Sequence, residues 1–543
     1  MALQTSSLRA TLSTRRLALV IFGLMLAMLM NAVETMIVST AMPRVIADLN
    51  GLDRYAWVFT AYMLASTVAV PIYGKLSDIY GRRPFFLGGM LVFLIGSALS
   101  GASQDMNQLI VSRSIQGLGA GGMMPLSQAV VGDIFPPRER GKWQGVIMSL
   151  WALGTIFGPT LGGWISDNWG WRWVFYMNMP VGALTLVTTG IAMPGLTARR
   201  EHTIDYLGAG LLAAGTVALL LALSWAGSTY AWFSFQILGT LLLALVSYVL
   251  FLRVESRAAE PIMRTSYFRN GIFAVSVIAT FLLSAGMFSN LQYTPLFVQG
   301  VIGASATSSG AVMTAHMIAF MVSNVVTGQL LSRMGRYKLM ATGAFVLALA
   351  GTLLFAVMNI HTTTAQVTRN MVLTGLGIGM GSLFVIVVQN AFPHSELGQV
   401  TATLQFFRSI GGTMGTALLG TVLTNSFQSA FQSNLTLPLR NALPPERLGE
   451  FQNPQVLLTP AASLQLQQNL GALGPQGERL FEQMVPVLRA SLSDAITSVF
   501  TVCAILMLLG LVATLFLREI PLRSTFDSSQ VPPPVREQAT GAD

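Results

Sequence analysis

The chain has 543 residues, of which 53% are hydrophobic and 10% are charged, and its mean hydropathy is +0.62. This composition excludes an ordinary soluble globular protein and indicates a chain that crosses a membrane many times. The net charge of +9 does not indicate nucleic acid, because the short predicted outer loops hold only Arg44, Arg54 and Arg172, whereas most of the other basic residues lie in the predicted inner segments. This positive-inside asymmetry predicts that both termini are cytoplasmic, beside anionic lipid headgroups of the bilayer.

The sequence contains fourteen apolar runs long enough to cross a hydrocarbon core about 30 Å thick as α-helices. The short alternating segments of outer-membrane barrels are absent. We therefore expect an all-α polytopic membrane protein. The predicted spans are residues 17–40, 56–76, 85–101, 106–128, 143–165, 173–194, 205–225, 235–252, 272–296, 308–331, 339–358, 367–390, 404–425 and 496–517.

Glu34 is the one acidic residue well inside a predicted span. A lone ionised carboxylate there costs several kcal/mol, so it takes a proton or pairs with a cation. Arg113, in the fourth span, is the one basic residue of the first half placed similarly. We predict that Glu34 and Arg113 lie close together and carry proton coupling. There are two alternatives. The residues form a structural ion pair that does not titrate, or Glu34 is a cation site in a water-filled cavity.

The loop after the second span, GKLSDIYGRR, begins at Gly74. Gly74 and Gly81 allow a tight turn, Asp78 can face the N-terminus of a helix, and Arg82 can pair with Asp133 at the inner end of the fourth span. Such contacts would act as a latch that exists only while the two halves are closed on that side. The alternative is a plain turn with topogenic charges, which we favour for the loop's other two basic residues.

The fifth span contains GTIFGPTLGG, in which three glycines recur every four residues. Such a smooth face allows a neighbouring helix to approach closely, and the proline bends the helix. Spacing alone predicts tight packing and does not identify a transport mode. The motif consists of Gly154, Gly158, Pro159, Gly162 and Gly163.

An internal repeat supports two homologous halves. GQLLSRMGRY from Gly328 matches the loop that begins at Gly74, with two glycines seven residues apart before an arginine. Transporters are often built from such halves, with substrate between them. The predicted organisation is a six-helix bundle over residues 1–200, two inserted helices and a linker over 201–270, a second six-helix bundle over 271–523, and a disordered cytoplasmic tail over 524–543.

Residues 426–495, between the last two spans, fall on the predicted outer face. Their second part has apolar residues at helical spacing, so we expect a partly helical excursion. A surface connector is the simpler interpretation, and a docking surface or gate is the alternative.

These motifs resemble the major facilitator superfamily, specifically its fourteen-helix drug:proton antiporter family. The loop from Gly74 matches the family's loop 2–3 signature, and the fifth span matches its antiporter motif in full. In the fourth helix, Arg113, Gln116, Gly117 and Gly119 match R-x-x-Q-G-x-G. The resemblance covers nearly the whole chain and implies a major facilitator fold of two six-helix bundles with two inserted helices, acting in export.

The chain departs from that family in two places. Its first helix has Glu34 where the family usually has Asp, and Ser332 in the second-half loop stands where the first half has Asp78. The second half holds no carboxylate within its predicted spans. His316 could titrate near neutrality or simply form hydrogen bonds. The candidates for lining a substrate cavity are Gln116, Asn290, Gln292, His316, Gln389 and Gln405, and Arg408 is a further polar group there.

The predicted function is proton-coupled multidrug efflux of hydrophobic or cationic compounds by alternating access. The alternatives are export of a lipid or lipid-like metabolite, and proton-coupled uptake. No phosphate loop, metal-ligand spacing or nucleophile motif indicates an enzyme, a metal or a cofactor, and the single cysteine, Cys503, excludes a disulfide within the chain. We expect a monomer in the bacterial cytoplasmic membrane, with a periplasmic adaptor or cargo carrier as a candidate partner.

Overall fold

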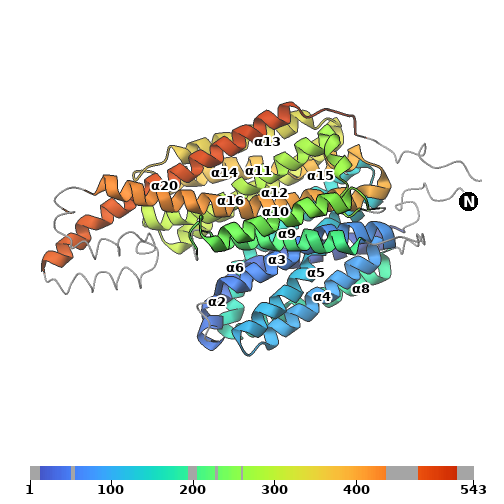
Figure 1. The fold of residues 1–543 in the computed structure, drawn as a ribbon, viewed down its shortest axis with the longest axis horizontal. Helices are drawn as coiled ribbons and strands as arrows, with labels where there is room; N and C mark the ends of the chain where they lie inside the picture. The colour runs from blue at the N-terminus through green and yellow to red at the C-terminus, as the bar shows by residue number, and fades with distance from the viewer. Residues whose placement is uncertain are drawn as a thin grey trace, which may run out of the picture.

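The computed structural model describes residues 13–49, 55–193, 205–226, 230–258, 261–435, 439 and 475–522. Within these ranges the regular structure is helical, and the one β-bridge joins Ala226 and Tyr230. The helices form two bundles and a pair of helices beside them (Figure 1). We call the end of the molecule at which the first described helix begins the inner end, and the opposite end the outer end. The predicted tail over 524–543 lies outside the described residues.

The N-terminal bundle is drawn in blue to cyan in Figure 1. The short α7 leads directly into α8, so the sixth predicted span is a broken helix. The bundle consists of α2 (Thr14–Leu49), α3 (Tyr55–Tyr80), α4 (Arg82–Ala102), α5 (Met106–Ile134), α6 (Pro137–Asn168), α7 (Arg172–Tyr176) and α8 (Asn178–Ala192).

The C-terminal bundle is drawn in yellow-green to red in Figure 1. Its twelfth predicted span is divided into two helices at Gly381 and Ser382. It consists of α11 (Gly271–Leu296), η3 (Phe297–Val301), α12 (Ala306–Met334), α13 (Lys338–Ala356), α14 (Thr364–Met380), α15 (Leu383–Ala391), η4 (His394–Glu396), α16 (Leu397–Asn434) and α20 (Pro475–Leu515).

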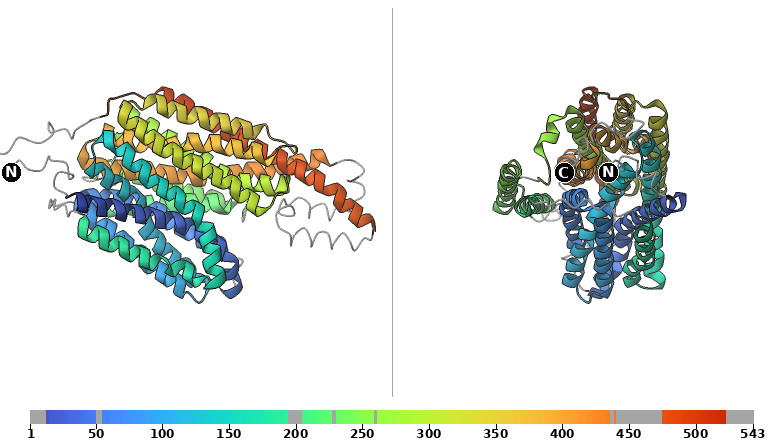
Figure 2. Two further views of the ribbon diagram at one scale, coloured as in Figure 1. Left: turned by 180° about the vertical axis from the view of Figure 1, so that it is seen from behind. Right: turned by 90° about the vertical axis from the view of Figure 1, so that its right-hand side faces the viewer.

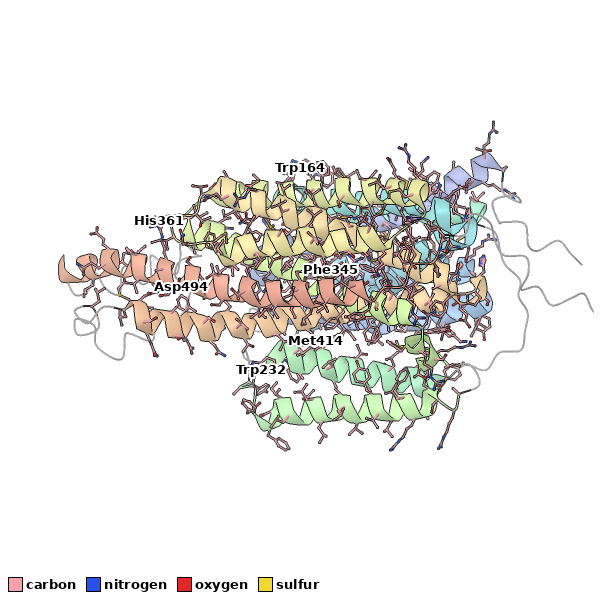
Figure 3. The ribbon with its side chains drawn as sticks, turned by 90° about the horizontal axis from the view of Figure 1, so that it is seen from above. Trp164, Trp232, Phe345, His361, Met414 and Asp494 are labelled. Carbon is pink, nitrogen blue, oxygen red and sulfur yellow. The ribbon has the colours of Figure 1, made fainter. Side chains whose placement is uncertain are left out.

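The two inserted helices, α9 (Tyr206–Trp225) and α10 (Phe235–Glu255), pack on each other. η2 (Thr265–Arg269) follows them and leads into α11. The two inserted helices lie beside α16. The indole of Trp232, which lies between α9 and α10 in the chain, donates a 2.8 Å hydrogen bond to Thr421 Oγ1 of α16 (Figure 3). Much of the surface of α10 is apolar and exposed, including Leu242 and Leu245, each 60% exposed. Such a surface suits contact with lipid.

Eleven helices or helix pairs are long and apolar enough to cross a membrane, among the residues that the structure describes. The remaining predicted spans fall in α5, α6 and α16, which are helical over 29, 32 and 38 residues but less apolar. The chain is an all-helical polytopic membrane protein, and the count of fourteen crossings stays a prediction.

The internal repeat has a structural counterpart in the two loops. Gly81, which precedes α4, has φ 93°, and Gly335, which ends α12, has φ 67°. Both values lie in the left-handed region that glycine adopts without a Cβ clash. The first glycines of the two motifs correspond as well, because Gly74 contacts Ala402 and Gly398 of the C-terminal bundle, while Gly328 contacts Gly141 of the N-terminal bundle.

Both described ends of the predicted outer segment 426–495 are helical. α16 continues to Asn434, and α20 already begins at Pro475, so the predicted 426–495 segment is helical at both ends. The protruding ends pack on each other through Phe427 and Phe431 of α16 and Met484, Leu488 and Leu492 of α20, each at most 1% exposed. This packing outweighs the backbone hydrogen bond that Pro486 removes within α20. Asp494 marks this protruding part in Figure 3.

Candidate functional site

Glu34 and Arg113 form an ion pair in the interior of the N-terminal bundle, which confirms the predicted proximity. Glu34 is 0% exposed and Arg113 is 1% exposed. Arg113 Nη1 also donates to Gln116 Oε1 over 2.7 Å, and the guanidinium carbon lies 4.2 Å from the centre of the Tyr62 ring. Removal of either charge is strongly destabilising, because it leaves the other buried without compensation.

Asn178, which the sequence reasoning missed, completes this site. Its amide Nδ2 donates to Glu34 Oε2 over 2.6 Å and to Ser97 Oγ over 2.9 Å, and Ser97 Oγ donates to the Phe175 carbonyl. The carboxylate on α2 is therefore held by α5 and α8, with α4 behind them. An amide inside the apolar run of the sixth span was the available signal.

The fifth-span motif packs α6 against α2 on either side of Glu34. A Cβ at Gly154 would lie 2.7 Å from Ala32 Cβ, and one at Gly158 would lie 2.8 Å from Met36 Cβ. Both distances are too short for a real contact. Gly162 is buried and Pro159 lies within the same helix. Gly163 has open space around it, because a Cβ added there would have no atom within 4 Å.

The predicted latch residues lie together at the inner end. Asp78 accepts hydrogen bonds from the backbone N–H groups of Gly398 (3.0 Å) and Gln399 (2.6 Å) at the start of α16, and it pairs with Arg82. Arg82 Nε also donates to Asp133 Oδ2 over 2.8 Å. Asp78 thus occupies the positive end of a helix that belongs to the other bundle.

His394 extends this network from the C-terminal bundle. Its Nδ1 lies 3.5 Å from Asp133 Oδ1, an ion pair when the imidazole is protonated. Burial lowers the pKa of His394 below its ordinary value, while Asp133 raises that pKa and the cations Arg140 and Arg82 lower it. The net direction is downward, although 46% of the His394 side chain is exposed.

A second set of contacts closes the inner end between α6 and α15. Arg140 donates to the carbonyls of Phe135 and Gly132 in its own bundle and over 3.4 Å to the carbonyl of Gln389 in the other. Gln144 Nε2 donates to Gln389 Oε1 over 3.3 Å. Together with the latch, these contacts hold the inner ends together, whereas the ribbons of the two bundles separate toward the outer end (Figure 2).

A cavity lies between the two bundles. Gln405 lines it and donates a 2.7 Å hydrogen bond to Gln128 of the other half. Its lining residues are Gln128, Met148, Thr280, Leu283, Ser284, Met287, Phe320, Ile378, Gly381, Ser382, Val385, Gln405 and Arg408.

Six side chains were predicted to line a substrate cavity, and Gln405 is the one of them that lines the cavity described. Gln116 lies with Arg113, and Gln389 belongs to the inner closure. His316 is buried between α12 and α14, with Nδ1 2.9 Å from the Met371 carbonyl, and Asn290 is buried in α11. Gln292 is exposed. These five do not line the cavity described, because polarity within a span does not reveal which side of the helix faces the other bundle, and their role in substrate binding stays a prediction.

The fold and site define a class before any comparison: a multi-pass membrane transport protein, with two bundles that close at one end around a central cavity. The model of the Major Facilitator Superfamily matches residues 24–205 and 198–416. The chain belongs to this superfamily of transporters and is not an enzyme.

Its relatives include multidrug transporters. Multidrug transporter protein MdtP of Bacillus subtilis (strain 168) is 38% identical over 513 residues, 93% of each chain. Multidrug resistance protein 3 of the same strain is 39% identical over 409 residues, 75% of this chain and 80% of the relative. The crystal structure of the human organic anion transporter MFSD10 (TETRAN) matches with a TM-score of 0.55, over 91% of this chain and 99% of that one. At 15% identity, this likeness shows the fold alone.

Proposed function

We propose that the chain is a proton-coupled multidrug efflux antiporter that exports hydrophobic compounds by alternating access. The observation that carries the proposal is the buried Glu34, held by Arg113 and Asn178 in a conformer whose inner end is closed. Two relatives that bear multidrug names support efflux. The bacterial cytoplasmic membrane, with both termini inside and the protein acting as a monomer, remains the expected setting.

Protonation of Glu34 supplies a physical route to coupling. A neutral Glu34 leaves the Arg113 cation without its counter-ion in a dry interior, which costs several kcal/mol. That cost favours another arrangement of α2 and α5, in which Arg113 finds other acceptors or water. Because α6 packs against α2 beside Glu34 and also contacts α12 of the other bundle, a shift of α2 reaches the interface between the halves.

In the proposed cycle, the described conformer awaits a proton from the outer side. Proton uptake by Glu34 accompanies substrate release outward, and the protein then opens inward, loses the proton to the cytoplasm and loads substrate again. The membrane potential supplies about 2.3 kcal/mol per charge per 100 mV. This exceeds the roughly 1.4 kcal/mol that a tenfold substrate gradient requires.

The cavity supports hydrophobic substrates more than cationic ones. Its lining includes Met148, Met287 and Phe320, and such apolar, adaptable side chains accept many shapes. No Asp or Glu occurs among its lining residues in the described part of the chain. Direct competition between a cationic substrate and the proton at Glu34 therefore stays a prediction.

The test is transport in proteoliposomes with an imposed pH gradient, with proton movement measured by an internal pH dye. Glu34→Gln keeps the side-chain size and removes the titrating group, so substrate-dependent proton movement is expected to disappear. Glu34→Asp, the matched control, is expected to retain part of it. Undiminished proton movement in Glu34→Gln would overturn the coupling assignment, and net uptake along the gradient would favour a nutrient importer.

Export of a lipid-like metabolite is a second candidate. The protruding ends of α16 and α20 offer a place where cargo could pass to a carrier or periplasmic adaptor. Transport of soluble dyes in proteoliposomes that contain the purified chain alone would count against this candidate.

A further inference from the structure

Arg408 carries a positive charge into the cavity between the bundles. It lies eleven residues after Leu397, the first residue of α16, which at 1.5 Å per residue is about 16 Å along the helix. Residue 408 lies within the predicted span 404–425, four residues from its inner end. Arg408 is partly buried and lines the cavity together with Gln405, one turn earlier on the same helix.

Arg408 differs from the arginines described above in having no partner for its guanidinium. Arg82 pairs with two aspartates, Arg113 pairs with Glu34, and Arg140 donates to backbone carbonyls. Within the described ranges, the Arg408 guanidinium makes no hydrogen bond or ion pair. A cation at this depth is costly unless an anion or several acceptors satisfy it.

Two hydroxyl groups in the same cavity also lack partners. Thr280 Oγ1 and Ser284 Oγ are buried and make no hydrogen bond with the residues that the structure describes. They lie four residues apart, on one face of α11, and both belong to the cavity lining. A hydroxyl can donate one hydrogen bond, so the cavity holds an unpaired cation and two unused O–H donors.

The remainder of the lining is mostly apolar. Met148 contributes from the N-terminal bundle, and Leu283, Met287, Phe320 and Ile378 contribute from the C-terminal bundle. An occupant that satisfies every group therefore has an apolar body and an anionic head. A carboxylate fits the head position, because its two oxygens match the fork of a guanidinium and accept further hydrogen bonds from hydroxyls.

We propose that the cavity binds amphipathic organic acids, with the carboxylate on Arg408, Thr280 and Ser284 and the apolar body against the methionines and Phe320. This names the substrate class of the proposed efflux function and depends on that function only for the direction of transport. Binding requires no gradient, and it requires the cavity, about 30 Å³ in the described conformer, to widen around the ligand.

The probes are three pyrene derivatives of one size: 1-pyrenebutanoate, its neutral primary amide, and the cationic 1-pyrenebutylamine. Binding to the full chain in lipid nanodiscs is measured by fluorescence at about pH 7, where the acid is ionised and the amine is protonated. The native protein is expected to bind the acid at least tenfold more tightly than the amide, and the amine most weakly. An equal or greater affinity for the amide or the amine would overturn the proposal.

Variants assign the preference to particular side chains. Arg408→Gln is expected to weaken acid binding at least tenfold and to change amide binding less than threefold, while Arg408→Lys keeps part of the preference. Amide binding and thermal unfolding show whether each variant is folded. If Arg408→Gln does not fold, the double variant Thr280→Val, Ser284→Ala serves instead. It is expected to bind the acid severalfold more weakly and the amide with unchanged affinity. An acid preference that survives these changes would overturn the assignment.

The two proposals fail separately. If the acid binds as expected but no proton movement accompanies its transport, the antiport proposal fails and the acid site stands. If protons move with a neutral or cationic compound and the acid shows no preference, antiport stands and the acid site fails.

Discussion

Asn178 on α8 donates a 2.6 Å hydrogen bond to Oε2 of Glu34 on α2, while Arg113 pairs with the other oxygen, Oε1. Both oxygens of a buried carboxylate are therefore satisfied in the same conformer. A proton that binds Glu34 removes the negative charge that both donors share, which weakens these bonds and links proton uptake to the positions of α5 and α8.

Replacement of Asn178 by Leu is expected to shift the pH dependence of transport. The change removes one donor to the charged carboxylate, and a hydrogen bond to a charged group contributes about 1.5–3 kcal/mol. The pH profile of transport should therefore differ measurably from that of the native protein. Ser97→Ala is the matched control, because Ser97 bonds to Asn178 and not to Glu34, so its shift should be smaller. An unchanged profile in Asn178→Leu would contradict a role for this bond.

Asp78→Asn is expected to open the inner end. The change removes the negative charge at the N-terminus of α16, an interaction that contributes about 0.5–2 kcal/mol. The fraction of inward-open protein should rise severalfold, as measured by the distance between spin labels placed at the inner ends of the two bundles in a Cys503→Ala background. Arg83→Gln should not change that distance, because Arg83 donates to Gly190 of its own bundle.

Gly141→Ala is expected to prevent full closure of the inner end. A Cβ at Gly141 would lie 2.6 Å from the Gly328 carbonyl oxygen, which is backbone and cannot move aside cheaply. Transport should fall at least tenfold, with the protein trapped inward-open in the same label experiment. Gly310→Ala is the control on α12, since nothing lies within 4 Å of its built Cβ; a similar loss there would show that the effect is general.

Acidification of the cytoplasmic side is expected to weaken the inner closure through His394. Burial lowers the His394 pKa in the closed conformer, so the closed form binds this proton less readily than an open, hydrated form. The closed state is therefore most favoured above the ordinary histidine pKa of about 6.5 and loses stability as the pH falls below it. His394→Gln should remove this part of the pH dependence of the label distance. A closure strengthened by acid in the native protein would show that the ion pair with Asp133 dominates instead.

If acids are exported in exchange for protons, transport is expected to be strongly electrogenic. One anion out and one proton in move two charges in the same electrical sense, or about 4.6 kcal/mol per 100 mV. Export of 1-pyrenebutanoate should therefore accelerate when valinomycin and potassium set an inside-negative potential. Exchange of a monovalent cation for one proton is electroneutral and should not respond. A potential-independent rate for the acid would contradict one-for-one exchange.

The sequence by itself determined the membrane class, the two related halves and the pair Glu34 and Arg113. These follow from local properties: about 20 apolar residues suffice to define a span, and a charge inside such a span requires a partner wherever the chain folds. The loop from Gly74 was recognisable by the local spacing of its glycines and arginine, but the helix that Asp78 caps lies 320 residues further along the chain.

Only the tertiary structure decided which polar groups meet. Asn178, Arg140 and His394 lie in ordinary stretches of sequence, and their contacts with Glu34, Gln389 and Asp133 join residues 144, 249 and 261 positions apart. The lack of an acid beside Arg408 is likewise a property of its surroundings in the fold, because the residues that line the cavity come from several helices and cannot be read from the sequence near Arg408. Spacing along a helix fixes which residues share a face, but the rotation of each helix against its neighbours, set by packing, decides what that face contacts.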